Sequence, residues 1–270
     1  QSSSISGRAM REPRNPLAIS FAVWQAIFLR EAIDRLFDMR AAWFWLLIEP
    51  ALHIAFITVV YSAVRMYTVG GIDVALWIIV GMLGFFLFRR TAIQVMYAVD
   101  CNRPLFAYRQ VKPFDPAIVR AVLEAFLMAI IASAILAAAA LLGHDSLPRD
   151  PLLVALAVGG LWLFGLGYGL VASVLMELVP ETEHILKLLM MPLYLISGVI
   201  MPMASVRQPY REFLLMNPIV HGVELVRQGF VPYYHVVPGV DMAYLYAWVI
   251  VSLLLGLLLY RRFALQLVMK

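Results

Sequence analysis

Charged residues are scarce in this chain, and long apolar runs take their place. Only 14% of the 270 residues are charged and 63% are hydrophobic. An ordinary soluble domain has about 25% charged and about 45–50% apolar residues. A soluble fold of this length could not bury so much apolar surface, so part of the chain must face lipid. The composition predicts one helical membrane bundle and leaves no room for a large soluble domain.

Residues that build chemical sites are also rare. The single Cys101 excludes an internal disulfide bond. The five histidines are scattered, and neither HExxH nor CxxC occurs, so we expect no metal site. None of the three lysines follows a glycine, so the chain has no P-loop and we expect no ATPase site or cofactor of its own. The cationic residues form no stripe, which argues against a nucleic-acid partner.

Six segments are apolar enough to cross a bilayer, or nearly so, since a span takes about 20 residues. They cover residues 41–64, 75–98, 117–142, 152–176, 185–204 and 243–260. The predicted fold is an all-α membrane protein with six transmembrane helices, forming a domain over residues 41–262. We expect residues 1–9 to be a cloning remnant before a natural start at Met10, and residues 10–40 and 263–270 to be the cytoplasmic ends.

Lys and Arg residues are unevenly distributed over the predicted connections. With both termini in the cytoplasm, fifteen of them lie inside and five outside, and the remaining one is in residues 1–9. Because cytoplasmic loops of membrane proteins are enriched in Lys and Arg, this predicts a multi-pass inner-membrane protein with both ends inside. A GxGxG run, from Gly165 to Gly169, lies within the fourth span, where small residues favour close helix packing over phosphate binding.

Residues 17–40 have apolar side chains at helical spacing and a polar face. The pattern predicts an amphipathic helix in the cytoplasmic interface. It would serve either as a plain membrane anchor or as an interface helix that also contacts a cytoplasmic partner. The residues that we assign to that interface are Phe28, Arg30, Glu31, Asp34 and Arg35.

Residues 205–242 form an irregular region with two helix-like pieces, near 209–216 and 219–230. Asn217-Pro218 separates them, since Asn before Pro disfavours helix continuation and can cap a new helix. The pattern indicates either short re-entrant helices on the periplasmic side, between spans five and six, or an ordinary loop. Re-entrant backbone must be covered by protein or line a cavity.

Charged residues at membrane depth are functional candidates. Glu49 either pairs with Arg89 or Arg90 or lies at the cytoplasmic boundary. The two arginines either extend to the inner headgroups or bind an anionic substrate. The aromatic side chains of Tyr97, Trp162 and Tyr168 either line a substrate path or pack against lipid and core.

The connection between spans two and three contains Pro104, Pro113 and Pro116, which bracket a short segment. Apolar side chains lie beside cationic ones here, a combination typical of a surface that docks another protein. The residues assigned to this docking are Asn102, Arg103, Pro104, Leu105, Phe106, Tyr108, Arg109, Gln110 and Lys112. The acidic connection from Glu177 to Lys187 could flank the same partner.

This layout resembles the membrane subunit of ABC-2 type exporters. The local match is Tyr194-Leu-Ile-Ser-Gly-Val-Ile-Met-Pro202, followed by Asn217-Pro218, His221, Glu224 and Arg227. Its Ser-Gly form, with Leu-Leu-Met-Asn-Pro, is most similar to the capsular polysaccharide exporters of Gram-negative bacteria. The motifs are short, but the resemblance covers nearly the whole chain from Met10.

The resemblance implies a homodimer in the bacterial inner membrane that binds two copies of a separate P-loop ATPase, which would hold ATP and Mg²⁺. Residues 102–113 would form the coupling helix, and Asn217, Pro218 and Arg227 would shape a periplasmic gate. The implied substrate is a lipid-linked acidic polysaccharide. A periplasmic co-polymerase or adaptor and an outer-membrane export protein would be further partners.

Three alternatives stay open at this point. The chain could be an ABC-2 permease for O-antigen, another glycolipid or a drug. It could be an intramembrane enzyme, for which Glu49 and His53, four residues apart on one helix face, are the candidate groups. It could also be a channel or scaffold that works without an ATPase.

Overall fold

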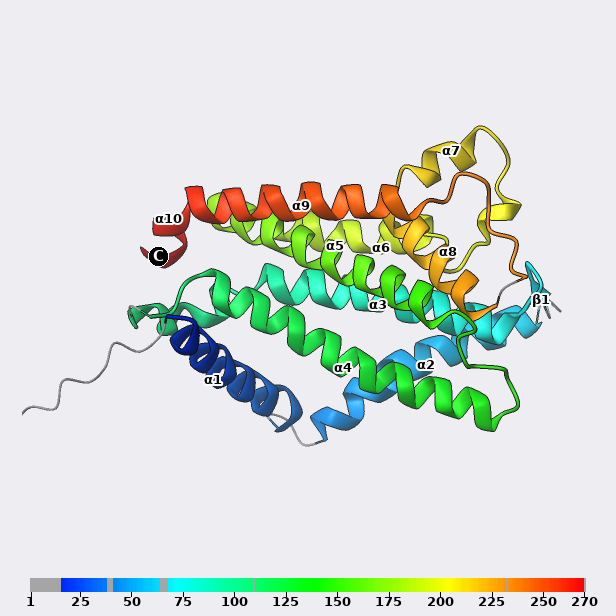
Figure 1. Cartoon of the computed structure of the whole chain (residues 1–270), viewed down its shortest axis with the longest axis horizontal. Helices are drawn as coiled ribbons and strands as arrows, with labels where there is room; N and C mark the ends of the chain where they lie inside the picture. The colour runs from blue at the N-terminus through cyan, green and yellow to red at the C-terminus, as the bar shows by residue number, and fades with distance from the viewer. Residues whose placement is uncertain (1–15, 38–40, 64–67, 109, 232, 270) are drawn as a thin grey trace, which may run out of the picture.

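A computed structural model describes residues 16–37, 41–63, 68–108, 110–231 and 233–269, an elongated helical bundle (Figure 1). The predicted remnant, Met10 and Arg109 lie outside this part of the chain. The helices are α1 (Pro16–Phe37), α2 (Ala42–Ala63), α3 (Val74–Met96), α4 (Phe114–Leu141), α5 (Pro151–Leu178), α6 (Thr182–Ile196), α7 (Tyr210–Leu215), α8 (Pro218–Phe230), α9 (Met242–Arg262) and α10 (Ala264–Met269). Two 3₁₀ helices, η1 (Asp100–Ala107) and η2 (Met203–Ser205), and a hairpin of β1 (Thr68–Val69) and β2 (Ile72–Asp73) complete it.

Five helices of the described residues are long and apolar enough to cross a membrane: α2, α3, α4, α5 and α9. The first four predicted spans and the last one therefore coincide with helices of the structure, and their ends agree within a few residues. The predicted fifth span, residues 185–204, is not one continuous helix. α6 has 15 residues, about 22 Å of helix, and the chain turns at Gly198, whose φ is +70°.

α3 forms the centre of the bundle and packs against α2, α4, α5 and α8. In its most apolar window 83% of the residues are buried, against 11% in α2. The GxGxG run explains part of this packing. Gly165 and Gly169 of α5 lie against α3, and Gly167 lies against Ser252 of α9. The interpretation of these glycines as packing residues is confirmed.

The bundle has two distinct ends (Figure 1). The α1 end holds α1, η1, the turn between α5 and α6, and the C-terminal α10. The α8 end holds the hairpin, the α4–α5 connection, α7 and α8. The hairpin, which the sequence did not predict, turns at Gly70 and Gly71, both with positive φ. The two helices predicted within 205–242 appear as α7 and α8 with nearly the predicted bounds.

α8 is a core helix and not a surface helix. Twelve of its 13 residues are buried, and it contacts α3, α5 and α9. Asn217 caps it as predicted, since its side chain accepts a hydrogen bond from the backbone N–H of Ile219 at 3.1 Å. The ordinary-loop interpretation of this region is therefore wrong.

Candidate functional site

The predicted docking segment at the α1 end is η1 with the turn that follows it. Pro104, Tyr108, Gln110 and Lys112 are exposed, whereas Asn102 and Phe106 are buried. Arg103 and Leu105 are half-buried. Arg103 binds Glu177 of α5 at 2.8 Å and Asp100 at 2.9 Å, so the Glu177–Lys187 connection begins beside the predicted docking segment.

Phe106 differs from the prediction of an exposed apolar residue. It is only 8% exposed and belongs to a small core shared with Ala117, Val95 and Tyr260. A 3₁₀ helix repeats about every three residues, so Phe106 and Arg103 share a side and Tyr108 turns outward. Tyr108 is 66% exposed and is the large apolar surface available to a partner.

Two of the charged residues of α1, Glu31 and Arg35, face the protein. Glu31 is 5% exposed, and its carboxylate accepts hydrogen bonds from Arg120 of α4 at 2.7 and 2.9 Å. Arg35 binds Glu124 of α4 and donates to Gln94 of α3 at 2.8 Å. The assignment of Glu31 and Arg35 to a partner-facing surface is therefore wrong, because the charges of α4 draw them inward.

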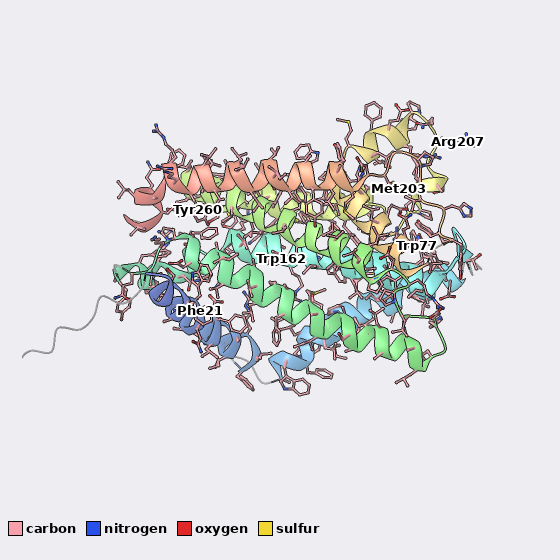
Figure 2. The ribbon with its side chains drawn as sticks, viewed as in Figure 1. Phe21, Trp77, Trp162, Met203, Arg207 and Tyr260 are labelled. Carbon is pink, nitrogen blue, oxygen red and sulfur yellow. The ribbon has the colours of Figure 1, made fainter. Side chains whose placement is uncertain are left out.

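The other α1 residues that we assigned to the partner interface differ in their surroundings. Phe28 packs edge-on against Phe126 of α4, and Arg30 donates to Asn102 of η1. Asp34 is exposed. Apolar side chains cover the outward face, where Phe21, Leu29, Ile33 and Phe37 are each more than half exposed (Phe21 is labelled in Figure 2). Such a face suits the headgroup and acyl boundary of a bilayer.

Glu124 is the central residue of this end that the sequence analysis missed. It lies within α4, is fully buried, and accepts from both Arg35 of α1 and Arg90 of α3. Arg90 is thus paired within the protein and also lines the groove between α2 and α3. A lone Glu inside an apolar span was the signal available in the sequence, because an unpaired carboxylate in that position would be too costly.

The charge state of Glu31 follows from its neighbours. Burial alone would raise the pKa of this carboxyl. The charge of Arg120 and the hydrogen bonds from Arg120 and Asn102 outweigh burial and hold the pKa below its usual range. Burial also lowers the pKa of Arg35 to about 10, with the charge of Arg120 adding to the effect. Both groups stay charged at neutral pH, so the ion pairs that join α1 to α4 are intact there.

A polar groove of about 300 Å³ lies between α2 and α3. Glu49, His53, Arg89, Arg90 and Gln94 line it. Glu49 and Arg89 are exposed in it, and no direct ion pair joins Glu49 to either arginine among the described residues. The alternative in which Glu49 pairs directly with Arg89 or Arg90 is thus not observed among the described residues. Glu49 and the two arginines instead line the same groove.

The side chain of His53 contacts two aromatic side chains. Its ring nitrogen Nε2 lies 3.3 Å from the hydroxyl of Tyr194, and its ring packs edge-on against Phe86. Glu49, one helical turn away, lies on the same groove wall. Glu49 and His53 have the sequence spacing that an acid–base pair on one helix would need. The group that contacts His53, however, is the phenol of Tyr194 and not the carboxylate of Glu49. The geometry favours a binding surface over a catalytic pair.

The three predicted path aromatics lie in three different places. Tyr97 donates to Glu183 at 2.7 Å near the α5–α6 turn. Trp162, labelled in Figure 2, lies in the middle of the bundle. It lines an apolar cavity of about 420 Å³ between α3, α4, α5 and α8 and donates to the backbone oxygen of Ala121 at 2.8 Å. Tyr168 packs against Phe88. Within one chain these residues line no common path.

Arg227 anchors a second buried cluster at the α8 end. It is fully buried, and its guanidinium lies 3.6 Å from the ring centre of Trp77. Trp77 is labelled in Figure 2. It pairs with Glu224 at 2.9 Å and donates to the backbone oxygens of Gly198 at 2.8 Å and Val199 at 3.0 Å. Tyr234 completes the cluster by donating to Glu224 at 2.8 Å.

This cluster joins α3, α8 and the end of α6. The side chain of Asn217 adds a hydrogen bond to Ser197 at 2.9 Å, one residue before Gly198. Pro218 is buried at the first turn of α8. The residues predicted to shape a gate therefore hold α8 in place by contacts within the protein.

The chain is similar to known proteins over most of its length. Residues 22–231 match the model of the ABC-2 type transporter family. The polysialic acid transport protein KpsM of Escherichia coli is 32% identical over 237 residues, covering 88% of this chain and 92% of that protein. The capsule polysaccharide export inner-membrane protein CtrC of Neisseria meningitidis serogroup A is 28% identical over 79% of this chain and 81% of its own length. BexB of Haemophilus influenzae, described in the same words, is 24% identical over 93% and 94%.

Proposed function

The chain belongs to the ABC-2 type transporter family, and we propose that it is the permease that carries a lipid-linked capsular polysaccharide across the bacterial inner membrane. The observation that supports this substrate is the nearly full-length similarity to inner-membrane proteins of polysialic acid transport and capsule export. ATP and Mg²⁺ bind to a separate P-loop ATPase, two copies of which act on a homodimer of this chain. A periplasmic adaptor and an outer-membrane export protein continue the route.

The proposed topology has six crossings with both termini in the cytoplasm. α5 ends at the α1 end and α6 begins there, whereas the residues after α6 bind Arg227 at the α8 end. α6 with its following turn therefore carries the chain across, although the helix alone is short. The α1 end, which holds most of the Lys and Arg residues counted as inside, faces the cytoplasm. α7 and α8 then form a re-entrant pair from the periplasmic side.

The partner ATPase docks on η1 and the neighbouring turn. ATP binding closes the two ATPase subunits, η1 moves with them, and the bundles rearrange at the seam of the dimer. Tyr108 is the exposed aromatic of this segment. Aromatic side chains in the centre of an interface contribute a large share of its binding free energy.

Replacing Tyr108 with alanine should release the ATPase without unfolding the permease. An interface aromatic contributes about 2 kcal/mol, so binding should weaken about thirtyfold. The measurement is the amount of P-loop protein, and its ATP turnover, recovered with the tagged chain from native membranes in mild detergent. Tyr210→Ala, which removes an equally exposed tyrosine from α7, should recover the full amount. Equal recovery with both variants would contradict the docking assignment.

The groove of Arg89 is the proposed place where the anionic lipid end of the polymer binds. Arg89 is exposed in the groove, whereas Arg90 is already paired with Glu124. Cells without the chain should accumulate polymer inside, and the wild-type chain should restore export. Arg89→Gln should restore it poorly, since one lost hydrogen bond between charged groups weakens binding by about 1.5–3 kcal/mol, tenfold or more.

The readout is the ratio of surface to intracellular polymer at equal permease levels. Arg261→Gln removes an exposed arginine of the same end and should export normally. Normal export by Arg89→Gln would make Arg89 an anchor to the headgroups. Normal export by cells that lack the chain would reject the polysaccharide function itself.

A further inference from the structure

A continuous line of buried polar contacts runs from the groove to η1. Arg90 donates to Glu124 at 2.9 Å, and Glu124 also binds Arg35 of α1. Arg35 lies 3.8 Å from Glu31, one helical turn back, and Glu31 accepts from the side chain of Asn102 in η1 at 3.1 Å. We call these five residues the charge path.

Three members of the charge path are shielded from solvent, whereas Arg35 and Arg90 are partly exposed. Glu124 and Asn102 are fully buried, and Glu31 is 5% exposed. Polar contacts in such surroundings are stronger than in water, and leaving one unmade is costly. A change at Glu31, Asn102 or Glu124 therefore affects the neighbouring side chains, because water does not reach these three residues.

The two ends of the charge path are the two places to which the proposed function assigns roles. Arg90 and Gln94 line the groove, and Gln94 also accepts from Arg35 at 2.8 Å. Asn102 lies in η1, beside the exposed docking residues. The middle members, Arg35 and Glu31, belong to α1, so this helix connects the groove to η1.

The charge balance around the groove favours an anionic ligand. Five guanidinium groups line the groove, belong to the charge path or pair with its member Glu31. Three carboxylates lie in the same places. The cations are Arg30, Arg35, Arg89, Arg90 and Arg120, and the anions are Glu31, Glu49 and Glu124. A phosphate or carboxylate bound at Arg89 and Arg90 would offset this excess.

We propose that Glu124 is a positioning residue that couples an anion in the groove to the placement of η1. This inference rests on the proposed function. An anion that binds Arg90 competes with Glu124 for the same guanidinium. Glu124 then shifts toward Arg35, which changes how Arg35 holds Glu31 and how Glu31 holds Asn102. Occupied and empty grooves thus give two arrangements of α1 and η1, and the ATPase binds one of them better.

The test uses the permease with its ATPase in phosphatidylcholine nanodiscs. The variant is Arg35→Gln combined with Glu124→Gln, which removes one charge of each sign and so keeps the net charge, leaves Glu31 paired with Arg120, and leaves Arg90 facing the groove. ATP turnover is measured with and without glycolipid extracted from cells that lack the chain, and glycolipid binding is measured in parallel. The matched control is Asp145→Asn combined with Arg149→Gln, an exposed ion pair in the α4–α5 connection, outside the charge path and away from the docking segment.

We expect the glycolipid to raise ATP turnover of the wild-type complex about fivefold or more. In the charge-path variant this ratio should fall to about one, while turnover without glycolipid and glycolipid binding are retained. The control variant should keep the wild-type ratio. Glu124→Asp, which keeps the charge but is too short to contact both arginines, should lose stimulation as well.

Two outcomes would overturn the inference. If the charge-path variant is stimulated like the wild type, Glu124 does not couple the sites, although the proposed function stands. If the glycolipid neither binds nor stimulates the wild-type complex, the proposed substrate and the coupling fail together. A parallel measurement with phosphatidylglycerol separates two anion sources. Stimulation by this lipid alone, lost in the same variant, would support the coupling and assign the groove to a bilayer lipid.

Discussion

Replacing Arg227 with glutamine should lower the free energy of unfolding by about 3–5 kcal/mol, because it leaves a buried carboxylate without its partner. Glu224 is fully buried and binds Arg227 at 2.9 Å. The substitution also removes the cation over Trp77 and the donors to the backbone oxygens of Gly198 and Val199. These losses occur together because one side chain joins three elements.

The measurement is the equilibrium unfolding of the purified chain in mixed micelles, followed by tryptophan fluorescence. Arg207→Gln is the matched control, since Arg207 is exposed at the same end, and it should change the unfolding free energy by less than about 0.5 kcal/mol. If Arg227→Gln unfolds like this control, the cluster does not stabilise the α8 end.

A second expected result tests whether the cluster acts as a unit. Glu224→Gln combined with Arg227→Gln should be less destabilising than the sum of the two single substitutions, because the double variant leaves no unpaired charge. Additive losses would mean that the ion pair contributes little and that the backbone contacts of Arg227 stabilise the α8 end.

Gly169→Ala should destabilise the bundle by about 1–3 kcal/mol, the usual cost of overpacking. A Cβ atom on Gly169 would lie 2.6 Å from the Cβ of Val95 and 2.8 Å from the backbone oxygen of Ala92. Neither atom is the end of a flexible side chain. The clash can be relieved only if α5 moves away from α3, the central helix of the fold.

Gly159→Ala makes the matched control for Gly169, since it lies on the same helix. A Cβ there would meet only the hydroxyl of Tyr246, at 3.8 Å, an ordinary contact. We expect this variant to be as stable as the wild type or more stable by up to about 1 kcal/mol, because alanine favours helix. The same unfolding measurement on both variants checks the prediction. Similar stabilities would contradict the close approach of α5 to α3.

Several elements follow from local sequence alone. The ends of α3, α5 and α9 lie within two residues of the predicted spans, because each follows from a long apolar run bounded by polar or turn residues. The separation of α7 from α8 follows from Asn217-Pro218, since a proline ends one helix and an asparagine caps the next. The absence of a P-loop likewise follows from three lysines and their neighbours.

The predicted fifth span shows where local pattern is insufficient. Residues 185–204 are mostly apolar, with Lys187 as the single charged residue, but α6 ends at Ile196 and the chain turns at Gly198. The carbonyls freed by this turn are satisfied by Arg227, which lies 29 residues further along the chain. Hydropathy detects the apolar run. It does not detect the hydrogen-bond donor, distant in the sequence, that allows the helix to end there.

The sequence by itself determined that this is a helical membrane protein, where five of its six predicted spans lie, and which family it resembles. Tertiary structure alone decided that Arg35 and Arg90 share Glu124, that Phe106 turns inward, and that Arg227 binds the end of α6. The physical reason is that apolar spans show no distinct face in their sequence. A buried charge takes its partner from whichever helices cross beside it, and those crossings depend on packing across the whole bundle.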